Sequence, residues 1–248
     1  MKDVAIWVSI HPYYWFFCLP LLAALIAWMC WSALSGQPPG RRRSALYACL
    51  ALIMAVVFVA LAATVSLEGN LVAFDVALAR ALSMSLSTEF LWLLSWFTHL
   101  GDRTWLTVLA IVMILGLLMW QHWVLAAGAA AATAGGGILN WLLKHFFERA
   151  RPDFSHGFSH ATGFSFPSGH ASASLAVYGF GCYLLLRLLP ARWQGLCVAM
   201  TAALIVAIGL SRVLLQVHFL SDVVAGLAVS ALWLALCVTL TERLQRRR

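Results

Sequence analysis

Residues 166–189 read FPSGHASASLAVYGFGCYLLLRLL, a short turn followed by an apolar run. The run begins at His170 and has roughly the 20 residues that a helix needs to cross a bilayer. A helix start presents unpaired backbone N–H groups and the positive end of the helix dipole, so it favours anions. Gly169 lets the backbone approach a ligand closely, Ser168 adds a hydroxyl donor, and His170 can release a proton near neutral pH. The stretch predicts an anion-binding turn at the boundary of a membrane span.

The composition of the whole chain agrees with a membrane protein. Of 248 residues, 63% are hydrophobic and 10% are charged, and the mean hydropathy is +0.90. Such a composition requires membrane spans. Seven apolar runs are long enough: Tyr13–Leu34, Ala45–Leu67, Thr104–Trp120, Trp123–Leu143, His170–Leu189, Gly195–Leu215 and Asp222–Thr241. We therefore expect an all-α fold, a polytopic membrane helix bundle.

The basic residues predict how the bundle is oriented. The formal net charge is +7, but the charges are scattered between apolar runs instead of forming one polar face, which excludes a nucleic-acid partner. If all seven runs cross, Arg41-Arg42-Arg43, the Arg187/Arg192 turn and the C-terminal arginines share one side. The positive-inside rule makes that side cytoplasmic. The connection Leu67–Arg103, of mixed character, predicts one or two short interfacial helices on the outer side.

One span is built for close packing. Ala126–Gly137 consists almost wholly of Ala and Gly, and small residues let membrane helices approach one another. We expect this span to be central. Asn140, which follows in the same run, must face protein or water, and a structural hydrogen bond is the favoured interpretation.

A cluster of cations follows that span. Lys144 and Arg151 are seven residues apart, which places them two helical turns apart on one face, so both can point at one anion. Pro152 is expected to end the helix. A snorkelling pair that anchors the helix end is the structural alternative. His156 and His160, in the next loop, are expected to be solvated loop histidines.

The segment Ser211–Asp222, between the last two spans, adds a second histidine. Arg212 is expected at the outer end of a helix. His218 and Asp222 are four residues apart, so on a helix the carboxylate can accept a hydrogen bond from one ring nitrogen. The other nitrogen is then held as a lone pair, as a nucleophile requires.

Together these groups suit phosphoryl transfer. Cations neutralise the phosphate oxygens, one histidine attacks, and the other protonates the leaving oxygen; the spacing does not decide which does which. Acidic residues are few in these segments, whereas a hard divalent ion needs several oxygen ligands. We therefore expect no metal and no cofactor. The six cysteines lie in apolar stretches without metal-like spacing.

The three motifs resemble the signature of the type 2 phosphatidic acid phosphatase family, lipid phosphatases related to vanadium haloperoxidases. The resemblance covers Ala45–Thr241 as a six-span core. It implies a phosphatase domain at 45–248, with residues 1–44 as an extra N-terminal span and cytoplasmic basic loop. It also implies roles: His218 as the nucleophile that forms a phosphohistidine, Asp222 as the residue that orients it, and His170 as the general acid. The phosphate-binding residues implied are Lys144, Arg151, Ser168, Gly169 and Arg212.

The expected function is hydrolysis of a lipid phosphate or diphosphate at the outer face of a bacterial inner membrane, with the C-terminus in the cytoplasm. Undecaprenyl diphosphate is the preferred substrate, because the short loop between the first two motifs leaves little protein to recognise a bulky head group. Phosphatidylglycerol phosphate, phosphatidic acid, the 1-phosphate of lipid A and a phosphotransferase reaction remain open. A lipid binder or transporter, or an intramembrane serine protease using Ser168, explains fewer of these residues. No obligate protein partner is evident.

Overall fold

The computed structural model describes residues 6–8, 10–35, 41–153, 157–158 and 161–247. His156 and His160 lie outside these residues. The described part is helical and contains no β-strand, which confirms the all-α prediction. Its main elements are α2 (Pro12–Ser35), α3 (Arg41–Ser66), α4 (Asn70–Ser83), α5 (Thr88–Phe97), η1 (Thr98–Gly101), α6 (Arg103–Met119), α7 (Trp123–Ala130), the π-helical turn η2 (Ala131–Gly135), α8 (Gly136–Phe147), α9 (Gly169–Leu188), α10 (Ala191–Leu214) and α11 (Leu220–Arg246).

Seven helical segments within the described residues are long and apolar enough to cross a membrane. Each overlaps one of the seven predicted runs, so hydropathy located every candidate span. The third segment is longer than predicted, because α5 and η1 continue into α6 and extend it to Thr88–Met119. The mixed segment Leu67–Arg103 does contain two short helices, α4 and α5, as predicted, although α5 is continuous with the third segment.

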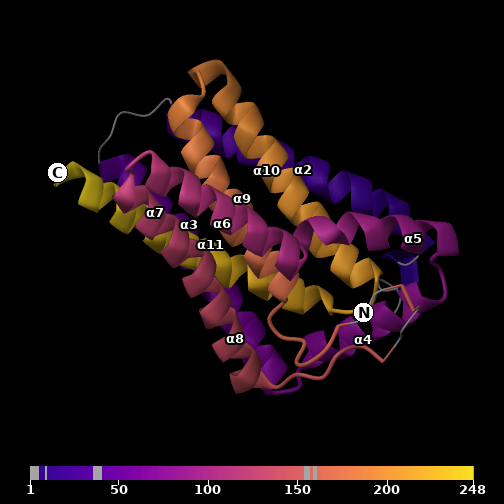
Figure 1. Cartoon of the computed structure of the whole chain (residues 1–248). Helices are drawn as coiled ribbons and strands as arrows, with labels where there is room; N and C mark the ends of the chain where they lie inside the picture. The colour runs from indigo at the N-terminus through magenta and orange to yellow at the C-terminus, as the bar shows by residue number, and fades with distance from the viewer. Residues whose placement is uncertain (1–5, 9, 36–40, 154–156, 159–160, 248) are drawn as a thin grey trace.

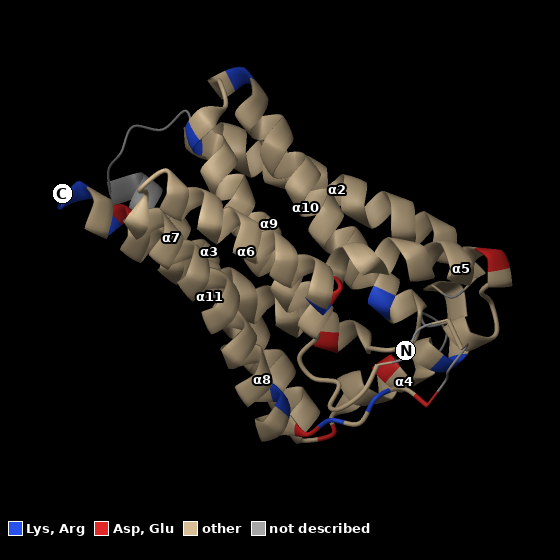
Figure 2. Cartoon of the chain, viewed as in Figure 1, with Lys and Arg blue, Asp and Glu red and all other residues tan. Residues whose placement is uncertain are grey.

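The helices form a bundle in which α9, α10 and α11 pack against one another. Figure 1 shows α2 running along α10, while α3 lies along α11. α4 lies across one end of the bundle and contacts both α10 and α11. Charged residues gather towards the two ends of the bundle, and the flanks between them carry few (Figure 2). This distribution is what an apolar bilayer core demands.

Small residues do allow close packing where the sequence predicts it. A Cβ atom added to Gly128 would lie 2.2 Å from Thr241 Oγ1 of α11, and one added to Gly135 would lie 2.8 Å from Trp233 of the same helix. Asn140 is buried, and its Nδ2 donates a hydrogen bond to Ser172 Oγ on α9 at 3.0 Å. The predicted close packing of this span and the predicted structural hydrogen bond are both confirmed, whereas its central place in the bundle remains a prediction.

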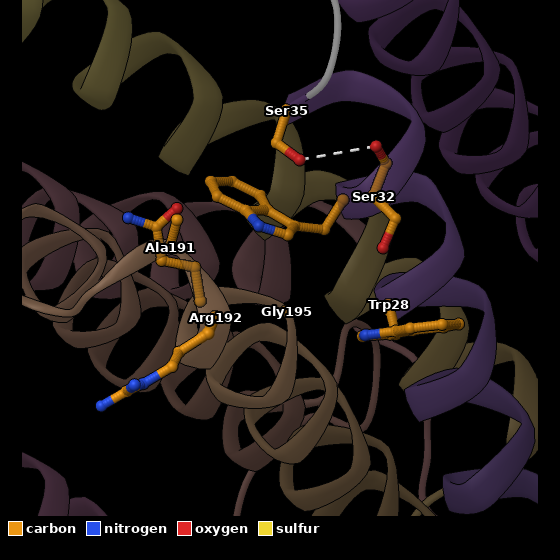
Figure 3. A pocket seen from close by; sticks show the side chains of 8 residues that line it. Trp28, Ser32, Ser35, Ala191, Arg192 and Gly195 are labelled. Carbon is orange, nitrogen blue, oxygen red and sulfur yellow. Dashed lines mark hydrogen bonds between the residues drawn. The ribbon is translucent and has the colours of Figure 1, made fainter.

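The two ends of the bundle differ in what they offer. A groove of about 480 Å³ opens between α2 and α10 where α2 ends and α10 begins, and Trp28, Ser32, Arg192 and Gly195 are among its lining residues (Figure 3). The other end joins the C-terminal ends of α8 and α10 to the N-terminal ends of α9 and α11. All the predicted site residues belong to that second end.

Candidate active site

The turn that the sequence singles out opens α9. The helix begins at Gly169, and Ser168, in extended conformation, is its N-cap. The Ser168 side chain is buried, and among the described residues its Oγ has no hydrogen-bond partner. A buried hydroxyl beside the free N–H groups of a helix start is suited to an anion.

The first motif reaches the site by a different path from the one predicted. α8 ends at Phe147, because Glu148 adopts a left-handed conformation with φ 45°. Pro152 therefore does not end the helix, and Lys144 and Arg151 do not share a helical face. The chain instead turns back, so that Lys144 Nζ and Arg151 Nη2 both donate to the Phe164 carbonyl, at 2.5 and 3.1 Å. The two cations still lie together.

Arg151 links the first motif to the third. Its Nη1 donates to the Val217 carbonyl at 2.6 Å and lies 3.1 Å from His218 Nε2. His218 is buried. Since an arginine has only N–H donors here, Nε2 must be the ring nitrogen that carries the lone pair.

The His218–Asp222 contact is present, but it does not arise from a shared helical face. α11 begins at Leu220, after its N-cap residue Phe219, so His218 precedes the helix. Asp222 folds back over the helix start: its Oδ2 accepts the Phe219 N–H at 2.9 Å and lies 3.4 Å from His218 Nδ1. Nδ1 therefore carries the proton that faces the carboxylate, and Nε2 faces away from it. Helix capping, which places a carboxylate against the first turn, produces the contact.

Burial decides the charge of His218. The side chain is 3% exposed, and loss of hydration lowers its pKa from 6.5 to about 4, although the hydrogen bond and negative charge of Asp222 partly oppose that change. The positive charges of Arg151 and Lys144 lower the pKa further. At pH 7 the imidazole is neutral, so the Nε2 lone pair is available to an electrophile.

The second motif packs directly on the other two. Ser168 N–H donates to the Asp222 carbonyl at 2.9 Å. A Cβ atom added to Gly169 would lie 3.9 Å from Lys144 Cε, and one added to Gly226 would lie 2.8 Å from the Ser168 carbonyl oxygen. Glycine at position 226 allows α11 to approach Ser168 closely, whereas the distance at Gly169 is an ordinary van der Waals contact. Residues from α8, α9 and α11 thus lie at one site.

His170 and Arg212 complete the set from α9 and α10. Arg212 is buried, and its Nη1 donates to Thr98 Oγ1 at 3.0 Å. Arg212 and Arg151 place positive charge near His170. His170 Nε2 also lies 3.9 Å from Asp102 Oδ1. Thr98 and Asp102, from the connection between α5 and α6, were not identified from the sequence; Asp102 is recognisable there only as the N-cap of α6.

Sequence reasoning also missed two groups that hold Asp222. Arg149 Nη1 donates to Asp222 Oδ1 at 2.6 Å, and Ser165 Oγ donates to Oδ2. Arg149 lies in the same basic run as Lys144 and Arg151, so its charge was visible. On the predicted helix, however, it would have pointed away from Arg151, because residues two apart do not share a helical face.

Within the described ranges, no group of three or more His, Cys, Asp and Glu side chains is arranged to hold a metal ion. The site contains cationic side chains, two histidines, side-chain hydroxyl groups and the N-terminal end of α9. These are groups that bind a phosphate and move a proton. The absence of a metal requirement remains a prediction.

The sequence model of the PAP2 superfamily matches residues 123–246, which include all three motifs. This chain belongs to the PAP2 superfamily. Phosphatidylglycerophosphatase B of Bacillus subtilis is 31% identical over 153 residues, 61% of this chain and 75% of the relative. Decaprenylphosphoryl-5-phosphoribose phosphatase of Mycobacterium tuberculosis is 32% identical over 139 residues, 54% of this chain and 71% of the relative.

A solved structure gives the same picture of the fold. The crystal structure of a transmembrane PAP2-type phosphatidylglycerolphosphate phosphatase from Bacillus subtilis superposes with a TM-score of 0.70 at 28% identity. The match covers 80% of this chain and 98% of that one. The family resemblance drawn from the motifs and the helical membrane fold predicted from the apolar runs are confirmed, and the relatives support a membrane lipid phosphatase.

Proposed function

We propose that this protein hydrolyses a lipid phosphate or diphosphate through a phosphohistidine at His218. The observation that carries the proposal is the arrangement of His218: Nδ1 faces Asp222, and Nε2 faces Arg151. A neutral histidine held in this tautomer beside a cation is suited to attack phosphorus.

In the proposed first step, the phosphate lies between Lys144, Arg151 and Arg212, with Ser168 Oγ and the start of α9 as further donors. Binding draws Arg151 Nη1 from His218 Nε2 to a phosphate oxygen, which frees the lone pair. Nε2 then bonds to phosphorus as the bond from phosphorus to the leaving oxygen breaks. His170, protonated in the substrate complex, gives its proton to that oxygen, which leaves as the lipid alcohol or, from a diphosphate, as the lipid monophosphate.

In the second step, His170 is neutral and accepts a proton from water. The resulting hydroxide attacks phosphorus, the bond to Nε2 breaks, and inorganic phosphate is released. Asp222 stabilises the positive charge on the His218 ring in both steps. None of these steps uses a metal or a cofactor, in keeping with the prediction that none is required.

Undecaprenyl diphosphate is the preferred substrate. Few residues separate Pro152 from Phe166, so little protein is available there to recognise a head group, and a polyprenyl diphosphate offers little beyond its phosphates. The mycobacterial relative, whose name specifies a polyprenyl phosphate lipid, is compatible with this choice. The name of the Bacillus relative favours phosphatidylglycerol phosphate as the second candidate. Phosphatidic acid and lipid A 1-phosphate are further alternatives, as is transfer of the phosphoryl group to a second lipid.

The orientation proposed is a multi-pass protein of the bacterial inner membrane, with the site facing the periplasm and the C-terminus in the cytoplasm. Arg187, in the last turn of α9, and Arg192, in the first turn of α10, support it, because positively charged residues are in excess at the cytoplasmic ends of membrane spans.

Phosphate release by the purified protein in detergent, with a chelator present, tests the function. The four lipids are undecaprenyl diphosphate, phosphatidylglycerol phosphate, phosphatidic acid and lipid A. His218→Ala should abolish release, whereas His122→Ala, which replaces a histidine between α6 and α7, should leave it unchanged. Appreciable release by His218→Ala would exclude His218 as nucleophile, and a strict magnesium requirement would exclude a metal-free site. No release from any lipid by the folded wild type would point to a binder or a phosphotransferase.

A further inference from the structure

Arg149 bridges two buried carboxylates. Its Nη1 donates to Asp222 Oδ1 at 2.6 Å and to Ser221 Oγ at 2.7 Å, and its Nη2 donates to Asp75 Oδ2 at 2.9 Å. The side chains of Arg149, Asp75 and Asp222 are 8, 1 and 0% exposed. The guanidinium also lies over the Phe219 ring, 4.3 Å from its centre. This cation is therefore largely enclosed by protein.

Asp75 comes from a distant part of the chain. It lies on α4, outside residues 123–246 that match the family description. Besides Arg149, its carboxylate accepts a hydrogen bond from Ser221 Oγ and from the Ser221 N–H at 3.3 Å. α4 is thereby attached to the first turn of α11, next to Asp222.

Stability alone does not account for this arrangement. Burial raises the pKa of Asp75, which reflects the desolvation that a carboxylate suffers in this position. Apolar side chains of similar volume often replace buried ion pairs without loss of stability. A carboxylate at position 75 therefore calls for a reason other than packing.

The contacts of Asp222 supply one. Its Oδ2 faces His218 Nδ1 and accepts from Phe219 N–H and Ser165 Oγ, and its Oδ1 accepts from Arg149. If Oδ1 were released, the carboxylate could rotate away from the histidine. If Asp75 were absent, the Arg149 fork could swing, since only one of its two terminal nitrogens would remain anchored to a carboxylate.

We propose that Asp75 and Arg149 are positioning residues, which hold Asp222 so that Oδ2 orients His218 for attack. Asp75 acts through Arg149, and Arg149 acts through Asp222. α4 thus forms part of the catalytic apparatus, although it carries none of the three motifs. This inference rests on the proposed phosphatase function.

The first test is a double-mutant cycle on phosphate release. Asp75→Asn and Arg149→Gln should each lower kcat by about 10- to 100-fold, the effect typical of groups that orient a catalytic ligand from behind. KM should change little, because neither residue contacts the phosphate. In the Arg149→Gln background, Asp75→Asn should have almost no further effect, since the carboxylate acts through the missing cation. If the losses of kcat in the two single variants were fully additive in the double variant, Asp75 would not act through Arg149.

The pH profile separates positioning from a general loss of folding. His218 is faced by Asp222 from α11, Arg151 from the loop after α8, Lys144 from α8 and His170 from α9. Arg149→Gln leaves the charge of Asp222 less compensated, so the acid limb of kcat/KM should move to higher pH. In Asp75→Asn, Arg149 no longer shares its charge with Asp75 and compensates the charge of Asp222 more fully. The pKa of His218 should therefore fall, and the acid limb should move to lower pH. An unchanged limb in both variants would overturn the proposal.

Arg149→Lys retains the charge but loses the two-pronged contact. It should lose rate while its acid limb stays near that of wild type. If Arg149→Gln fails to fold, Arg149→Lys and Asp75→Asn together test whether Arg149 positions Asp222.

The matched control is Arg187→Gln. This variant breaks an arginine–carboxylate pair of similar length, 2.8 Å to Glu242, at the other end of the bundle, and kcat should be unchanged. Suppose that the wild type is active, that its activity depends on His218, and that Asp75→Asn leaves kcat unchanged. The positioning role would then be rejected, and the proposed function would stand. Failure of wild type to hydrolyse any lipid would instead reject the proposed function.

Discussion

His218 is both neutral and close to the cations that can hold a phosphate. It is buried deeply enough to be neutral, yet its Nε2 faces a cluster of cations that can hold a phosphate. Nδ1 faces a carboxylate that can stabilise the ring once it becomes positively charged. One side chain is thus arranged for both the resting and the phosphorylated state.

The lowered pKa of His218 predicts an unusual pH profile. The free enzyme is competent only while Nε2 is unprotonated, so kcat/KM should fall as the pH drops through about 4 instead of through the ordinary 6.5. The measurement is kcat/KM across the acid range, corrected for the separately measured ionisation of the substrate phosphate. A corrected limb that remains near the ordinary histidine value would contradict the buried, neutral His218.

At the residue scale, the sequence reveals site residues that a local pattern marks. It misses those whose role depends on a contact with a residue far away in the sequence. Lys144, Ser168, His170 and Arg212 stand beside helix ends, where hydropathy places them near a membrane boundary. Asp75 meets Ser221 across 146 positions in sequence. No local pattern marks such a pair, because only the packing of α4 on α11 brings the two together.

At the level of elements, hydropathy predicts well which segments of the chain are long helices. Every apolar run became a helix, since burying or spanning an apolar segment requires its backbone hydrogen bonds to close internally. Two details failed for a common reason. Glu148 ends α8 in a left-handed conformation uncommon for a non-glycine residue, and His218 lies before α11 instead of within it. Both concern helix ends, where tertiary contacts outweigh local preference.

The packing of α2 on α10 provides a test at the level of elements. A Cβ atom at Gly195 would lie 2.7 Å from Trp28 Cδ1 and 2.9 Å from its Nε1. Gly195→Leu should therefore push the helices apart and destabilise the bundle by about 1–3 kcal/mol, as overpacking does. The catalytic rate of the folded fraction should be unchanged, because this groove is at the opposite end from His218.

Thermal unfolding in detergent, followed by tryptophan fluorescence, measures that change. Gly181→Leu is the matched control, because nothing lies within 4 Å of a Cβ atom added to Gly181 of α9. Equal midpoints for the two variants would show that the contact between Gly195 and Trp28 is not tight. A selective loss of kcat in Gly195→Leu would show that the two ends of the bundle are coupled.

At the scale of the whole molecule, α2 is the helix that the family resemblance predicts to lie outside the phosphatase core. Phe16 of α2 belongs to the same buried cluster as Leu78 of α4 and Phe90 of α5. α2 is thus packed into the bundle, near the helix that carries Asp75. The division of the chain at residue 44 remains a prediction, since contacts of this kind join α2 to the rest without showing whether the rest folds alone.

The orientation of the bundle yields the last prediction. α6 runs from the catalytic end at Arg103 to the opposite end at Met119, so the exposed residues Met84 and Trp120 lie on opposite sides if α6 crosses the membrane. In a cysteine-free background, Met84→Cys should react with a membrane-impermeant thiol reagent in cells whose outer membrane alone is permeabilised. Trp120→Cys should react only after the inner membrane is opened, because its end carries Arg187 and Arg192 and the positive-inside rule makes that end cytoplasmic. The reverse pattern would place the active site in the cytoplasm, and labelling of both before the inner membrane is opened would show that α6 does not cross.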